Sequence, residues 1–118
     1  MTQVEQGWRV AQPRSPLPAG QVIEIQFAKF TPRVTIRSER ELTVEVVAGA
    51  YLGFSDTVAY EAVAVRDDLI LLSWREHNGS TITHALDLAA GITYAAVTPA
   101  SGDFERLTGR ITLSRRTI

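Results

Sequence analysis

Residues 69–88 read LILLSWREHNGSTITHALDL, and this stretch decides the fold. Two runs rich in leucine, isoleucine and threonine flank Asn78-Gly79, a pair that can adopt the positive φ angles of a tight type I′ turn. Such a turn joins antiparallel strands, so we expect a hairpin with strands at 69–76 and 81–88. The turn also supplies the register, which decides the face on which each side chain lies.

Outward from this hairpin, short runs of valine, isoleucine and threonine recur between glycine, proline or charged residues. No stretch has the period and length of a helix. Eight short antiparallel strands would leave exposed edges in an open sheet, and closure into a barrel removes them. We therefore predict an all-β, eight-stranded, up-and-down barrel, the geometry of lipocalin-like binding proteins. The alternative is a filled barrel or sandwich without a cavity. The predicted strands are 22–27, 33–38, 42–48, 58–66, 69–76, 81–88, 92–98 and 107–115.

The length and composition fit a single domain. A chain of 118 residues with 45% hydrophobic content can bury a core of its own. The prolines at 13, 16 and 18 lack amide donors and cannot lie inside a sheet. Residues 1–20 are therefore predicted to form an N-terminal arm, in which Trp8 packs against the domain or plugs one end. Residues 21–118 form the barrel domain.

Composition also excludes several classes of function. The absence of cysteine excludes disulfides, thiolate metal sites and a cysteine nucleophile. A formal net charge of -1 argues against a nucleic-acid partner. No apolar run has the length of a membrane span or a signal peptide, so we expect no membrane association and a cytoplasmic protein. The two histidines do not form a recognisable set of metal ligands, so we expect no metal. Phosphate-binding and nucleophile motifs are also missing, and we expect no cofactor.

Alternation along the central hairpin predicts which side chains face the interior. Glu76 and His84 would share an apolar lumen, where burial shifts pKa values and acid–base chemistry becomes possible. The alternative is that Glu76 lies in water and His84 is a hydrogen-bonded core histidine. The expected interior set is Ile70, Leu72, Trp74 and Glu76, followed by Ser80, Ile82, His84, Leu86 and Leu88.

Two other segments add candidate wall residues. Tyr60 is expected inside the barrel, where its hydroxyl needs a partner such as a ligand or Glu76. Ala62 and Ala64 on the same face leave room for a cavity. The apolar, aromatic segment 49–56 contains Phe54, and it either caps the mouth of the barrel or packs on its rim.

Four motifs carry a family resemblance: Tyr60-Glu61-Ala62, Ser73-Trp74-Arg75-Glu76, the run THALDL at 83–88, and Gly109-Arg110-Ile111. With them the chain resembles the MoaF-like family of small calycin barrels, which implies a calycin (lipocalin-like) barrel with a ligand cavity. The Ser-Trp-x-Glu strand end is also similar to bacterial phenolic acid decarboxylases, in which the glutamate matching Glu76 acts in proton transfer. Their paired tyrosines are missing from 22–27 and their substrate-binding arginine from the loop near Gly53, and His84 replaces an apolar residue. The comparison therefore implies that any acid–base groups of this chain differ from those of the phenolic acid decarboxylases.

Three functional interpretations remain open. The leading one is a barrel that binds a small apolar or aromatic molecule, with Glu76 and His84 as orienting polar groups. The second is a cofactor-free lyase, isomerase or cyclase, in which Glu76 and His84 move protons on a phenolic or polyketide-like substrate. The third is a structural interaction module that forms a homodimer through its barrel wall. The expected ligand walls are Tyr60, Trp74, Ile82, Leu72, Leu86 and Phe54.

Overall fold

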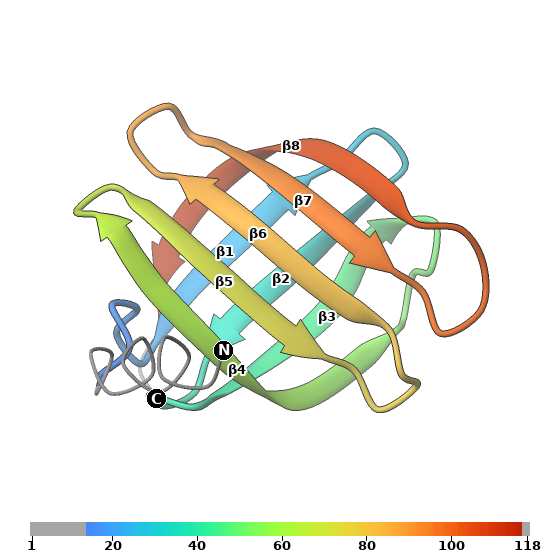
Figure 1. Cartoon of the computed structure of the whole chain (residues 1–118), viewed down its shortest axis with the longest axis horizontal. Coiled ribbons are helices and arrows are strands. Elements are labelled where there is room, and N and C mark those ends of the chain that lie inside the picture. The colour runs from blue at the N-terminus through green and yellow to red at the C-terminus, as the bar shows by residue number, and fades with distance from the viewer. Residues whose placement is uncertain (1–13, 117–118) are drawn as a thin grey trace, which may run out of the picture.

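The computed structural model describes residues 14–116, which form a closed antiparallel barrel of eight strands (Figure 1). Each strand pairs with the next in the chain, and the second half of β8 pairs with the whole length of β1. The predicted eight-stranded all-β barrel is therefore confirmed. Trp8 and most of the predicted arm lie outside the described residues. The strands are β1 (Gln21–Gln26), β2 (Phe30–Ile36), β3 (Glu41–Gly49), β4 (Ser55–Arg66), β5 (Leu69–Arg75), β6 (Thr81–Asp87), β7 (Ile92–Thr98) and β8 (Glu105–Arg115).

The central hairpin forms, although its turn differs from the predicted type. Trp74 lies opposite Ile82 across β5 and β6. Gly79 alone in this turn has a positive φ, of 95°, so the turn is not type I′. The Gly79 amide donates to the Glu76 carbonyl oxygen (2.9 Å), and the Glu76 amide donates to the Ser80 carbonyl oxygen (2.8 Å). The connection is thus a three-residue loop with a left-handed glycine, which still places Trp74 and Ile82 on the same inner face.

Three strands begin two or three residues earlier than the sequence predicted. β2 starts at Phe30 and contains Pro32, beside a register shift that lies between Thr31 and Pro32. A bulge tolerates a proline because the ladder is locally interrupted there, and this is why the strand continues through a residue that normally ends one. β4 starts at Ser55 and β8 at Glu105. These extra residues lengthen the barrel wall at one end.

The opposite end of the barrel is filled. Side chains such as Ile36, Leu72 and Leu86 are completely buried there, and Leu17 from the segment before β1 packs against them. This segment is the blue trace at the left of Figure 1. The Gly20 amide donates to the Ile36 carbonyl oxygen (2.8 Å), which anchors the segment to β2. We call this the closed end of the barrel.

No helix in residues 14–116 is long and apolar enough to cross a bilayer.

Candidate functional site

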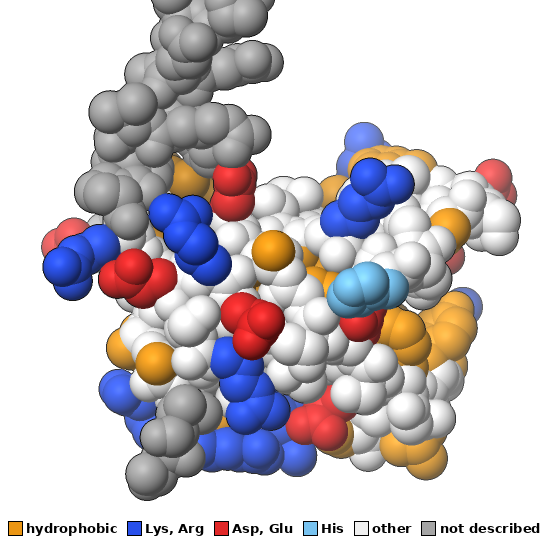
Figure 2. Space-filling view, turned by 90° about the horizontal axis from the view of Figure 1, so that it is seen from below, with side chains coloured by type: hydrophobic (Ala, Val, Ile, Leu, Met, Phe, Trp, Pro, Cys, Tyr) orange, Lys and Arg blue, Asp and Glu red, His pale blue; other side chains and the backbone are white. Residues whose placement is uncertain are grey.

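The other end of the barrel contains a cavity of about 410 Å³, which opens between the β1–β2, β3–β4, β5–β6 and β7–β8 connections. We call this end the mouth, and two of its connections lie at the right of Figure 1. In Figure 2 hydrophobic side chains also gather toward the right, beside the pale blue histidine. The lining residues are mostly aromatic and aliphatic, which is typical of a site for an apolar ligand. They include Phe27, Phe30, Val44, Val46, Phe54, Trp74, Glu76, Ile82, His84, Ala95, Val97 and Glu105.

The residues proposed from the sequence divide between the two ends. Five of them line the cavity: they come from β5, from β6, from the loop before β4 and from the turn after β5. The other three are buried in the packed half of the barrel and do not line the cavity. The first group is Phe54, Trp74, Glu76, Ile82 and His84, and the second is Tyr60, Leu72 and Leu86.

His84 is buried inside the barrel, with a relative exposure of 2%. Its ring stacks between Trp74 (centroids 5.4 Å apart) and Phe27 (6.3 Å). Its Nδ1 lies 2.9 Å from Thr93 Oγ1, and that hydroxyl donates to the Ala85 carbonyl oxygen (3.3 Å). Because a hydroxyl has one hydrogen, this network assigns Nδ1–H as the donor to Thr93 and leaves Nε2 unprotonated.

The protonation state of His84 follows from its burial. Desolvation lowers the pKa of its imidazole to about 4, so the ring is neutral at pH 7. Nε2 has no hydrogen-bond partner among the described residues, and it is not one of the fully buried unpaired atoms. Since His84 lines the cavity, Nε2 is open to it. His84 therefore presents a neutral acceptor, or a weak base, to whatever occupies the cavity.

Glu76 lies half-buried where β5 enters its turn. Its Oε2 accepts a hydrogen bond from Trp74 Nε1 (3.2 Å), so one indole ring touches both Glu76 and His84. Burial raises the pKa of the Glu76 carboxyl, and the charge of Asp56 raises it further, whereas hydrogen bonds from Trp74 and Asn78 oppose the rise. The site thus has a carboxyl group that ionises less readily than usual beside a histidine that resists protonation.

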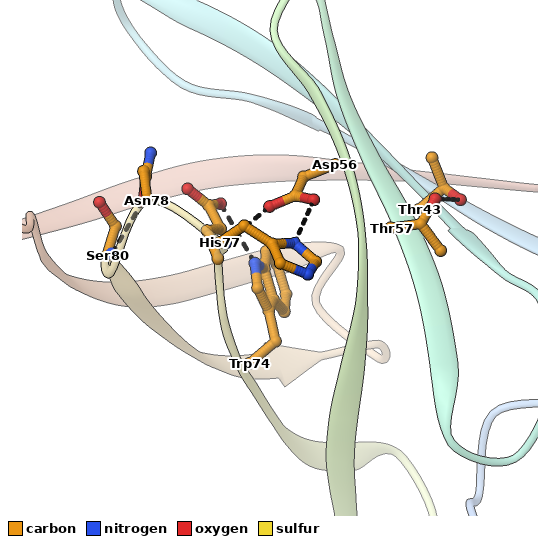
Figure 3. A network of polar contacts seen from close by, with 8 residues as sticks. Thr43, Asp56, Thr57, Trp74, His77, Asn78 and Ser80 are labelled. Carbon is orange, nitrogen blue, oxygen red and sulfur yellow. Dashed lines mark hydrogen bonds and ion pairs between the residues drawn. The ribbon is translucent and has the colours of Figure 1, made fainter.

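The β5–β6 turn is tied to β4 outside the cavity. His77 donates its backbone amide to Asp56 Oδ2 (2.8 Å), and its Nδ1 lies 2.7 Å from Asp56 Oδ1 (Figure 3). Burial opposes ionisation of Asp56, but the hydrogen bonds from His77 and its ring charge outweigh it and hold the pKa of the carboxyl below its usual value. The Asn78 side chain accepts from the Ser80 amide (2.8 Å) and closes the turn. These contacts fix the loop that carries Glu76.

The apolar β3–β4 loop lies on the rim of the mouth. Tyr51 and Leu52 adjoin the cavity but remain 72% and 68% exposed, so the loop does not cap the barrel. Tyr51 has a φ of 65°, a strained value for a non-glycine residue, and its ring packs edge-on against Phe30 with centroids 5.5 Å apart. The Ala50 amide donates to the Lys29 carbonyl oxygen (2.9 Å), which joins this loop to the β1–β2 loop.

Several lining residues were missed by the sequence reasoning. Phe30 and Glu105 lie in the parts of β2 and β8 that were predicted as loops. Ala95 and Val97 follow the alternation of β7, which could have identified them. Phe27 occupies the space over Gly109, where an added Cβ would lie 2.8 Å from its ring. The glycine therefore creates the place in which Phe27 stacks on His84.

Two predictions about Tyr60 and its neighbours were wrong. The Tyr60 hydroxyl does not meet a ligand or Glu76: it donates to the Ser38 carbonyl oxygen and hydrogen-bonds with Ser15 Oγ, both at 2.8 Å. Ala62 packs in the core and Ala64 is exposed, so neither makes room for the cavity. The reason is that β4 carries these residues toward the closed end, whereas the cavity lies at the start of this strand.

Together, the closed eight-stranded barrel and its single-ended apolar cavity define a small calycin-like barrel. The MoaF-like family model matches residues 19–112, and the chain belongs to this family. A solved structure from Burkholderia vietnamiensis, described as a "putative beta-lactamase", is similar with a TM-score of 0.80 and 27% sequence identity. The similarity covers 87% of this chain and 100% of that one. No curated protein sequence matches the chain.

Proposed function

We propose that this protein binds a small apolar or aromatic molecule in the cavity at its mouth. The observation that carries the proposal is an open cavity of about 410 Å³ whose mostly apolar wall includes a few polar groups, among them Glu76 and His84. Ligand sites in proteins commonly have volumes of about 300 to 1,000 Å³ and few polar groups that orient the ligand. A molecule of two aromatic rings would stack on Trp74 and meet the free Nε2 of His84.

The test is a titration with N-phenyl-1-naphthylamine, a neutral two-ring probe whose fluorescence rises in apolar surroundings. Ala95 is buried, lines the cavity and pairs with His84 across β6 and β7, so Ala95→Phe should fill the cavity. Ala96 follows it on the outer face, and Ala96→Phe is the matched control. We expect saturable binding by the wild type and the control, and at least about a tenfold loss of affinity in Ala95→Phe. Equal affinities for both variants, or no binding by the wild type, would contradict the proposal.

A second candidate function is proton transfer on the bound molecule. The observation that favours it is the pair of shifted groups on Trp74: the neutral imidazole of His84 supplies a base, and the Glu76 carboxyl, whose pKa burial raises, supplies an acid. In such a cavity His84 would take a proton from a carbon beside a carbonyl, and Glu76 would donate one to the carbonyl oxygen. This is the chemistry of a cofactor-free isomerase, lyase or cyclase.

The measurement is hydrogen–deuterium exchange at the carbon next to the carbonyl of 1-tetralone, a two-ring ketone, followed by proton NMR in D₂O. The wild type should accelerate exchange over buffer. Glu76→Gln and His84→Phe should remove the acceleration while binding of the naphthylamine probe persists. Exchange at the buffer rate with bound ketone would leave the protein as a binding protein and reject this second function.

The description of the Burkholderia vietnamiensis structure raises lactam hydrolysis, and the residues of this chain do not support it. A serine lactamase needs Ser-x-x-Lys, and the single lysine, Lys29, has no serine three residues before it. A metallo-lactamase needs a set of metal ligands, and among residues 14–116 no three His, Cys, Asp or Glu side chains are grouped to hold an ion. We therefore do not propose this activity.

A further inference from the structure

Within residues 14–116, the charged side chains that line the cavity all have the same sign. Glu76 and Glu105 contribute to the lining, whereas no lysine or arginine of this part of the chain does. His84 is buried and neutral. An anionic ligand would therefore meet half-buried Glu76 inside the cavity and exposed Glu105 at its rim, and like charges repel most where burial removes water, as at Glu76. Carboxylates and phosphates are therefore disfavoured as ligands by the charges of the lining.

The hydrogen-bond donors of the wall are largely occupied. The Trp74 indole N–H is used by Glu76, and the Nδ1–H of His84 is used by Thr93. Apart from the amide of Asn78 and the hydroxyl of Ser80 near the turn, and the hydroxyl of Tyr51 at the rim, the remaining side-chain polar atoms of the lining are acceptors. A ligand that pairs with these acceptors therefore has to supply a hydrogen-bond donor or a positive charge of its own.

Aromatic rings surround the same space. Phe27, Phe30, Phe54 and Trp74 line the cavity, and Tyr51 adds a ring at the rim. The faces of such rings carry negative potential and attract ammonium groups, most strongly when water is excluded. Several rings around a carboxylate form the kind of site that recognises alkylated ammonium ions in other proteins.

The arginines near the mouth lie on the outside of the wall. Arg106 follows Glu105 in β8, and alternation turns it outward, where its guanidinium lies 5.2 Å from the centre of the Phe104 ring. Arg75 precedes Glu76 and is exposed on the outer face of β5. Arg75 and Arg106 thus lie on the outside of the wall, whereas Glu76 and Glu105 contribute to the lining of the cavity.

We propose that the ligand of this cavity is a hydrophobic organic cation, an amine or quaternary ammonium group carried on an apolar or aromatic body. Glu76 would face the positive charge, Trp74 and the phenylalanine rings would surround it, and the apolar wall around Ile82 and Val97 would hold its body. This inference rests on the proposed ligand-binding function and narrows it to one class of ligand.

The experiment compares three probes with the same ring system. They are the (2-naphthylmethyl)trimethylammonium cation, its uncharged isostere 2-neopentylnaphthalene, and the 2-naphthylacetate anion, each measured at pH 7.5 by displacement of N-phenyl-1-naphthylamine. We expect the cation to bind about tenfold more tightly than the isostere, and the anion to bind most weakly. Glu76→Gln should reduce this preference for the cation without changing affinity for the isostere, because the aromatic rings and Glu105 remain in the variant. Glu41→Gln, which removes an exposed carboxylate near the closed end, is the control and should behave as the wild type.

The outcomes separate the two proposals. If the uncharged isostere or the anion binds as tightly as the cation, or if Glu76→Gln keeps the full preference, the inference about charge is overturned and the ligand-binding function stands. If neither the naphthylamine nor any of the three probes binds, both proposals fail. Glutamine retains an acceptor for the Trp74 N–H, so the variant is expected to fold and the comparison of probes within it is internally controlled.

Discussion

The two ends of this barrel are built from the same eight strands and differ in what fills them. At the closed end, Leu17 and Tyr60 occupy the interior, and the Tyr60 hydroxyl is held by Ser15 and Ser38. At the mouth the wall residues surround a cavity of about 410 Å³. Alternation along a strand selects the inner side chains, but the connecting segments decide whether the space between them is filled. We infer that the closed end supplies most of the stability and the mouth supplies the binding site.

The largest expected effect is a difference between the two ends in how much a core truncation lowers the free energy of unfolding. Leu86 is fully buried in the packed half, and Leu86→Ala should lower the free energy of unfolding by about 2 to 5 kcal/mol, because a new cavity is created. Ile82, two residues earlier in β6, already adjoins the cavity, so Ile82→Ala should cost about half as much or less. Urea unfolding followed by circular dichroism measures both. Equal losses would show that the mouth is packed as tightly as the closed end.

The second prediction concerns acid sensitivity at the mouth. The pKa of His84 is about 4 in the folded protein and 6.5 in the reference state, so the unfolded chain binds the proton more tightly. Stability due to neutral His84 is present at pH 7 and is lost as the pH falls from about 6.5 toward 4, by about 3 kcal/mol in total.

A comparison with a matched variant isolates the contribution of His84 to the pH dependence of stability. Protonation of Glu76, whose pKa burial raises, changes stability in the opposite direction, so wild type is compared with His84→Gln, which keeps Glu76 and can still bond to Thr93. Urea midpoints at pH 7 and pH 4 should fall more in the wild type than in the variant. Parallel losses in the two proteins would mean that His84 is not desolvated.

The smallest expected effect belongs to the closed end. Tyr60→Phe leaves the Ser38 carbonyl oxygen without its buried donor and should lower the free energy of unfolding by about 1 to 2 kcal/mol. Binding of the naphthylamine probe should not change, because Tyr60 does not line the cavity. Tyr94→Phe on the exposed outer face is the control and should stay within about 0.5 kcal/mol of the wild type. A loss of probe affinity in Tyr60→Phe would contradict the separation of the two ends.

The closed barrel and the central hairpin could be predicted from sequence because they depend on local signals. The glycine at 79 and the alternation around it placed Trp74, Ile82 and His84 on one inner face, and the structure has them there. The turn type was wrong because the positive φ is needed by Gly79 alone, which a sequence pair of Asn and Gly does not reveal.

The location of the cavity could not be predicted in the same way. It depends on which end of the closed barrel receives Leu17 and Tyr60, and this follows from strand tilt and from contacts between residues far apart in the chain, such as Tyr60 with Ser15. The small side chains Ala62 and Ala64 suggested space at the wrong end. Phe30 and Glu105 were missed because the predicted strands began only at 33 and 107, whereas β2 and β8 begin at Phe30 and Glu105.

The most direct test of a hollow, ligand-binding mouth is a two-dimensional ¹H–¹⁵N NMR titration of the wild-type protein with N-phenyl-1-naphthylamine. The amides of residues 27–30, 51–54 and 76–84 and the indole N–H of Trp74, assigned with Trp74→Phe, should shift and saturate together. Amides around Leu17 and Ser38 should remain unchanged. Shifts confined to the closed end or the outer sheet face, or an unchanged spectrum at saturating probe, would contradict the account.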